Sequence, residues 1–151
     1  MKLLVVALLF PLAFYAQEEQ YFTLQLELDA RNALFGGTVN EKGYDVVIKG
    51  GFSAQWFRVD GFFEVFEILK YKSSGVNFYA LINHRRAFKQ GLGFQISLID
   101  KPKKLTPSMA LNGLLEYHFG PVFISARGET KMRTDWRITV HSGFVGVGYK
   151  I

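Results

Sequence analysis

Apolar and polar residues alternate along most of the chain with a period of two. The clearest run is Tyr44–Trp56, whose even positions are apolar or glycine and whose odd positions include Asp45, Lys49 and Ser53. Successive side chains of a β-strand point to opposite faces of the sheet. The run therefore predicts a strand with one apolar face and one polar face.

Seven further segments repeat this alternation. Apart from the apolar N-terminal run, no segment of the chain shows a helical period of 3.6 residues. The seven segments are Tyr21–Ala30, Phe57–Leu69, Val76–His84, Phe88–Ile99, Ser108–Phe119, Val122–Glu129 and a last segment from Trp136. In the last segment the apolar phase changes near Gly143, which predicts a β-bulge there. The pattern predicts an all-β chain of eight strands.

The predicted connections alternate between long and short. The longer ones are Arg31–Gly43, Lys70–Gly75, Asp100–Pro107 and Thr130–Asp135, and the tight ones lie around Gln55, at Arg85–Ala87 and at Gly120–Pro121. Short turns at one end and longer loops at the other are typical of an up-and-down antiparallel β-barrel. Strands of about ten residues also match the length of tilted transmembrane strands.

The polar face carries acids and bases in near balance. An eight-stranded barrel has room inside only for side chains, and charges enclosed there have to be paired. Arginine suits such enclosed ion pairs better than lysine does. We therefore predict that the apolar face meets lipid and that the polar face forms an interior ion network. The candidates for this network are Glu27, Asp45, Lys49, Arg58, Asp60, Glu64, Glu116, Arg127, Glu129 and Arg137.

Lysines gather in the predicted longer loops, which would place them at one rim of the barrel. This candidate basic rim consists of Lys70, Lys72, Lys101, Lys103, Lys104, Lys131 and Arg133. Such cations could bind the phosphates of outer-membrane lipid or lipopolysaccharide, or they could only keep the loops solvated. Aromatic residues near the segment ends would form the two interfacial girdles of a membrane barrel.

The first residues predict export. Lys2 precedes an apolar run that ends at Ala16, and the polar residues Gln17-Glu-Glu-Gln follow at once. This is the pattern of a secretory signal peptide, so we expect residues 1–16 to be removed and residues 17–151 to form one domain. The 151 residues include no cysteine, which excludes disulfides and thiolate metal sites.

With these features, the chain resembles the small eight-stranded outer-membrane β-barrels of Gram-negative bacteria, the OmpA/OmpX type. The resemblance covers the whole chain after the signal peptide and is one of pattern. It implies a transmembrane barrel in the cell outer membrane. Members of that group usually end on an aromatic residue, whereas this chain ends Gly148-Tyr149-Lys150-Ile151.

Candidate chemistry is sparse. His84, His118 and His141 lack the spacing of metal ligands, so we expect them to cap turns or join the interior network. His141 and Ser142 suggest a lipid hydrolase, but adjacent strand residues point to opposite faces. We therefore predict a monomer with no catalytic, metal or cofactor site and no nucleic-acid partner, whose role is structural, adhesive or envelope-interacting. A soluble secreted barrel that binds an apolar ligand is the main alternative, and a lipid A hydrolase is a further one.

Overall fold

The computed structural model describes residues 20–31, 45–66, 71–82, 87–101, 104–133 and 139–151. The predicted signal peptide, residues 1–16, lies outside these ranges. Within them, no helix is both long enough and apolar enough to cross a membrane.

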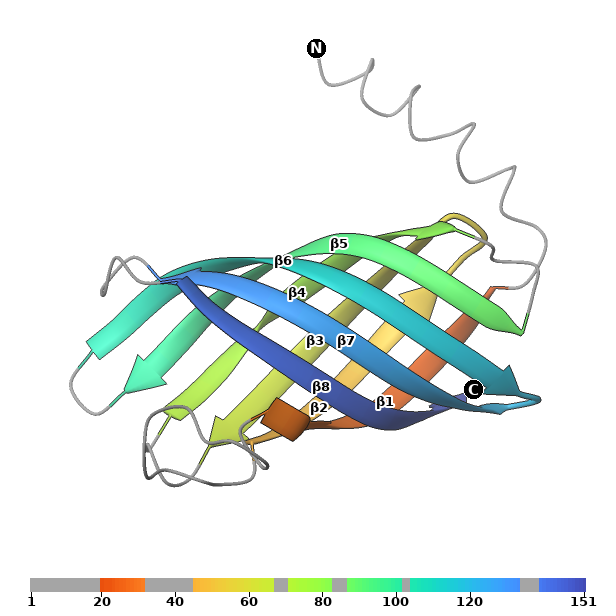
Figure 1. Ribbon diagram of the computed structural model, residues 1–151, viewed down its shortest axis with the longest axis horizontal. Coiled ribbons are helices and arrows are strands. Elements are labelled where there is room, and N and C mark those ends of the chain that lie inside the picture. The colour runs from red at the N-terminus through yellow and green to blue at the C-terminus, as the bar shows by residue number, and fades with distance from the viewer. Residues whose placement is uncertain (1–19, 32–44, 67–70, 83–86, 102–103, 134–138) are drawn as a thin grey trace, which may run out of the picture.

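Eight antiparallel strands make up the molecule. They are β1 (Tyr21–Asp29), β2 (Asp45–Ser53), β3 (Phe57–Phe66), β4 (Tyr71–Ile82), β5 (Phe88–Lys101), β6 (Lys104–Phe119), β7 (Val122–Arg133) and β8 (Thr139–Lys150). Each strand pairs with its neighbours in sequence, and β8 pairs with β1, so the sheet closes into a barrel (Figure 1). The predicted up-and-down barrel of eight strands is confirmed.

The barrel has two distinct ends. At the loop end β1, β3, β5 and β7 finish, and at the terminus end β1 begins and β8 finishes near the C-terminus (Figure 1). Strands extend further toward the loop end than the alternation predicted. Lys101 pairs with Lys104, and β4 already begins at Tyr71, so the predicted loops Lys70–Gly75 and Asp100–Pro107 consist mostly of strand. Backbone pairing continues there because it does not require an apolar face.

The predicted bulge at Gly143 is wrong. β8 pairs with β7 without a break from Thr139 to Tyr149, including Gly128 opposite Gly143 and Arg127 opposite Phe144. The odd residues of β8 face outward throughout, so His141 lies outside and Val140 points inward. The apparent change of phase arises because an apolar residue, Val140, occupies an inward position and a polar one, His141, occupies an outward position.

Polar side chains fill the inside of the barrel and apolar side chains cover the outside. On β2, Ile48 exposes 52% of its surface, whereas the next residue, Lys49, exposes 1%. On β6, Leu115 is exposed and Glu116 is buried. Burial of charge beneath an exposed apolar wall is the reverse of a water-soluble protein. It is the arrangement of a transmembrane β-barrel.

An aromatic belt surrounds the terminus end. Trp56, Phe57, Phe88, Phe119 and Tyr149 are all exposed there. This matches the predicted girdle at one interface, where aromatic side chains meet lipid head groups. Toward the loop end, Tyr44 and Trp136, two aromatic residues at the ends of predicted strands, lie outside the described residues.

Glycines inside the barrel allow neighbouring strands and side chains to approach closely. A Cβ atom added to Gly93 would lie 2.3 Å from the carbonyl oxygen of Phe78 and 2.5 Å from the ring of Tyr79. A Cβ atom on Gly50, which faces outward, would meet nothing within 4 Å.

We expect Gly93→Ala to lower the free energy of unfolding by about 1–3 kcal/mol, because overpacking forces a rigid backbone to move. The matched variant Gly50→Ala is expected to change it by less than about 0.5 kcal/mol, as at other unconstrained surface sites. Urea unfolding of both variants in vesicles measures the difference. Equal losses would contradict the close packing at Gly93.

Candidate functional site

An ion triad occupies the middle of the barrel. Glu27 on β1 accepts a hydrogen bond from Lys49 Nζ at 2.7 Å and another from Arg127 Nε at 3.0 Å. Lys49 comes from β2 and Arg127 from β7, so the three charges connect strands on both sides of β1. All three side chains are almost completely buried. One carboxylate therefore holds two cations away from water.

The network extends toward the loop end through β7. Arg127 also donates to Glu129, and Lys131 Nζ lies 2.8 Å from Glu129 Oε1 and 3.2 Å from Glu64 Oε2. Alternate residues of a strand share a face, which places Arg127, Glu129 and Lys131 in one inward column. The column has alternating charge, so each ion is compensated by its neighbours.

A second cluster lies toward the terminus end and is centred on Arg58 of β3. Its guanidinium donates to Asp60 Oδ1 at 2.7 Å and also pairs with Glu116. Glu116 in turn lies 3.2 Å from His118 Nε2. The expectation that His118 joins the interior network is confirmed. One arginine therefore spans the interior between β3 and β6, which are three strands apart in the barrel.

Gln25 joins the two clusters. Its amide oxygen accepts from Arg58 Nη2 at 2.7 Å, and its amide nitrogen donates to Glu27 Oε1 at 2.9 Å and to Ser125 Oγ at 2.6 Å. The ion pairs and hydrogen bonds from Glu64 to His118 therefore form one connected network. Gln25 was not among the predicted network residues, because the alternation shows which face a side chain points to but does not identify its partner.

Aromatic rings fill the space between the charges. The guanidinium carbon of Arg127 lies 3.8 Å from the ring centroid of Phe144, and that of Arg58 lies 5.5 Å from Phe123. Such cation–π contacts add to the ion pairs that hold the guanidinium groups. Phe144 also packs with Val47 and Phe62, an apolar cluster inside the barrel. Side chains thus occupy the interior across its width.

Nine of the ten predicted network residues are buried in this interior, and the tenth, Arg137, lies outside the described residues. The residues of the candidate basic rim do not all lie where they were predicted. Lys131 is 5% exposed and paired with two glutamates, so its assignment to the rim is wrong. It is the next inward position of β7 after Glu129, and extending the alternation of that strand would have found it.

The other rim candidates divide into three groups. Lys72 is exposed on β4, at the loop end. Lys101, Lys104 and Arg133 occupy the loop-end positions of β5, β6 and β7, so they lie on strands and not in loops. Lys70 and Lys103 lie outside the described residues.

The structure shows no catalytic pairing of His141 with Ser142. His141 is exposed on the outer wall, while Ser142 is on the inward side of β8. Within the described ranges, no group of three or more His, Asp or Glu side chains is placed to hold a metal ion. His84 lies outside those ranges.

No protein-family model matches the chain, and a search of curated proteins finds no match. Solved structures with the same fold are found. A designed transmembrane β-barrel has a TM-score of 0.59 at 11% sequence identity, covering 90% of this chain and 99% of the design. The outer membrane protein Ail of Yersinia pestis has a TM-score of 0.58 at 13% identity, covering 88% of this chain and 100% of Ail.

The N-terminal β-barrel domain of Pseudomonas aeruginosa OprF has a TM-score of 0.55 at 9% identity, covering 90% of this chain and 99% of that domain. The fold is that of the small transmembrane β-barrels. At these identities the likeness concerns the fold, and it confirms the resemblance at that level. The almost complete coverage of each barrel means that the shared fold extends over the whole sheet.

Proposed function

We propose that this chain is a small, monomeric barrel of the bacterial outer membrane whose role is structural, adhesive or envelope-interacting. The observation that carries the proposal is the inverted distribution of residues, with paired charges inside and exposed apolar side chains outside. The barrels of Ail and OprF, which share the fold, support the outer membrane as its location. The signal-peptide pattern of residues 1–16 supports export to that membrane.

The interior favours a role other than transport. Seven acids and five lysines or arginines are buried among the described residues, and most of them take part in the connected network. A barrel of eight strands has a lumen that side chains can fill. Passage of an ion through this lumen would require Arg58, Arg127 or their partners to move and leave buried charges uncompensated. We infer that the barrel is closed.

Because the interior is closed, the outer wall and the loop end are the surfaces that can bind other molecules. The outer wall contacts lipid, and the loop end carries the exposed Lys72 together with the strand-end positions of Lys101, Lys104 and Arg133. Cations near a membrane surface attract phosphate groups. We propose outer-membrane lipid, including lipopolysaccharide, as the partner of these surfaces. We also propose that the protein is not an enzyme, a view supported by the separation of His141 from Ser142 on opposite faces.

The proposal is tested by folding the mature chain with and without lipid vesicles and by recording current across planar bilayers that contain it. We expect folding and a monodisperse state only with vesicles or detergent, and no single-channel steps in current. A monomeric, folded protein in plain buffer would refute the membrane location. Regular conductance steps would refute the closed interior while leaving the location intact.

A further inference from the structure

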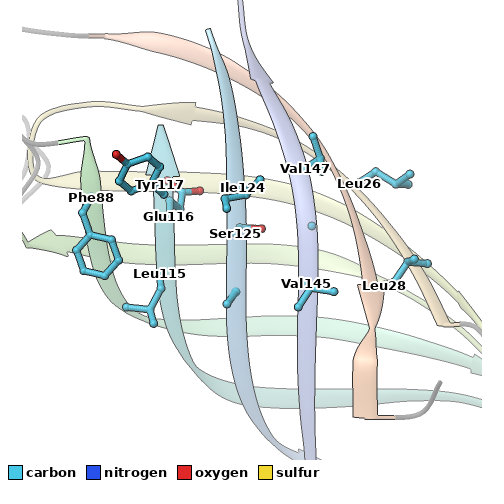
Figure 2. A pocket seen from close by; sticks show the side chains of 12 residues that line it. Leu26, Leu28, Phe88, Leu115, Glu116, Tyr117, Ile124, Ser125, Val145 and Val147 are labelled. Carbon is cyan, nitrogen blue, oxygen red and sulfur yellow. The ribbon is translucent and has the colours of Figure 1, made fainter. Parts of the chain in front are cut away.

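A hollow in the outer wall lies over β6, β7 and β8 and reaches β5 and β1. Its volume is about 660 Å³, and Figure 2 shows Leu115, Ile124, Val145 and Leu28 around it. The small side chain of Ala126 lies on β7 between Leu115 of β6 and Val145 of β8. The hollow therefore forms because the methyl group of Ala126 does not fill the space between its larger apolar neighbours.

A row of three glycines continues the hollow toward the loop end. Gly113, Gly128 and Gly143 are direct partners across β6, β7 and β8. A Cβ atom on any of the three would meet nothing within 4 Å. The wall is thus bare backbone across three strands, immediately beside the row that contains Ala126. An extended hydrocarbon chain can lie against this surface without displacing any side chain.

Polar groups stand at the loop-end limit of this bare strip. Thr130 and His141 are the next outward pair beyond the glycines, and Thr130 Oγ1 lies 3.1 Å from His141 Nδ1. Arg31, two residues after the end of β1, donates a hydrogen bond to the backbone carbonyl of His141. Because Nδ1 faces the threonine hydroxyl, the Nε2 atom of His141 lies on the opposite edge of the ring. Arg31 and His141 thus bring together two groups that can donate hydrogen bonds to a phosphate.

The depth of this polar group suits a lipid head group. Val122 pairs with Tyr149 of the aromatic belt, and Thr130 lies eight positions further along β7. At a rise of 3.4 Å per residue and a strand tilt of about 40°, these eight positions span about 21 Å along the membrane normal. The apolar band of such barrels is about 25 Å tall. Thr130, His141 and Arg31 therefore lie near the head groups of the loop-end leaflet.

We propose that this strip is a binding site for a phosphorylated, acylated lipid of that leaflet, namely lipopolysaccharide. Arg31 and His141 bind a phosphate of its lipid A, and one acyl chain lies over Gly128 and ends in the hollow at Ala126. About 14 Å of strand separates Thr130 from Ala126, which gives the acyl chain an extended path. Cations complement the phosphate charge, and the hollow is continuous with the lipid-facing wall. The inference rests on the proposed outer-membrane location, with the loop end outward.

The test compares binding of rough-type lipopolysaccharide, its dephosphorylated form and phosphatidylglycerol to the mature protein by native mass spectrometry from detergent micelles. We expect the phosphorylated lipopolysaccharide to bind about tenfold more tightly than the other two, the scale of one charge-assisted contact. Equal binding of phosphatidylglycerol would overturn the choice of lipopolysaccharide. Equal binding of the dephosphorylated form would overturn the phosphate site.

Matched variants separate the strip from the rest of the wall. Gly128→Leu is expected to weaken binding about tenfold by filling the bare strip, whereas Gly50→Leu, an equally open outward glycine three strands away, leaves it unchanged. Arg31→Ala with His141→Ala is expected to weaken it at least as much, and Lys150→Ala, which removes a cation at the terminus end of β8, is the control. Equal effects of a variant and its control would overturn the site.

Insertion of the same preparations into vesicles is measured in parallel. Protein that inserts but does not bind lipopolysaccharide refutes this site and lipopolysaccharide as a partner, and it leaves the proposed outer-membrane barrel standing. Protein that fails to insert refutes the proposed function itself.

Discussion

Replacing Arg127 by methionine is expected to lower the free energy of unfolding by about 3–5 kcal/mol, the cost of leaving a buried ion without its partner. Arg127 pairs with both Glu27 and Glu129, and its guanidinium packs against Phe144. Methionine keeps much of the volume but removes the charge. Urea unfolding from lipid vesicles, followed by the fluorescence of the two tryptophans, measures the loss.

Two controls identify the cause. Lys72→Met removes an exposed cation and is expected to change stability by less than about 0.5 kcal/mol. Adding Glu129→Gln to Arg127→Met is expected to restore part of the loss, because neighbouring charges of one network are energetically coupled. A loss below about 1 kcal/mol for Arg127→Met would contradict the view that the buried network supports the barrel.

Ile48→Arg is expected to cost about 2–4 kcal/mol when the protein is folded in a bilayer, the usual penalty for arginine near the middle of the lipid-facing wall. Ile48 lies near the middle of β2 and is half exposed. In a water-soluble barrel the same change at an exposed position would alter stability by less than about 0.5 kcal/mol. Unfolding in vesicles therefore distinguishes the two environments.

The dependence on depth provides the control for this prediction. Phe22 is also exposed but lies at the terminus end of β1, near the aromatic belt. Phe22→Arg is expected to cost at most about 1 kcal/mol, because the penalty decreases toward the interface. Equal losses at Ile48 and Phe22 would mean that the wall does not cross the hydrocarbon region.

Alternation of residues was sufficient to predict the barrel and most of its interior. Each strand has a buried and an exposed face, so period-two positions such as Ile48 and Lys49 report directly on the side to which they point. The partners of each charge were not predictable. Arg58 pairs with Glu116 across the barrel and Gln25 joins two clusters, and such contacts depend on register and closure instead of local pattern.

The wrong predictions concern residues whose type favours one environment while the backbone places them in another. Lys131 was assigned to a loop because lysine prefers water, yet the pairing of β7 continues past it and two glutamates compensate its charge. His141 was expected to cap a turn or join the interior network, yet the register of β8 places it on the outer wall. In both cases backbone pairing determined the position, and side-chain polarity did not.

The orientation of Ile48 tests the central claim most directly. The chain has no cysteine, so Ile48→Cys provides a single site for a nitroxide spin label. With the protein in vesicles, we predict that dissolved oxygen, which concentrates in lipid, relaxes this label much more strongly than a water-soluble nickel chelate does. A label at Trp56→Cys, in the turn after β2, should be more accessible to the chelate. Equal or greater access of the chelate to the label at position 48 would contradict a lipid-facing wall.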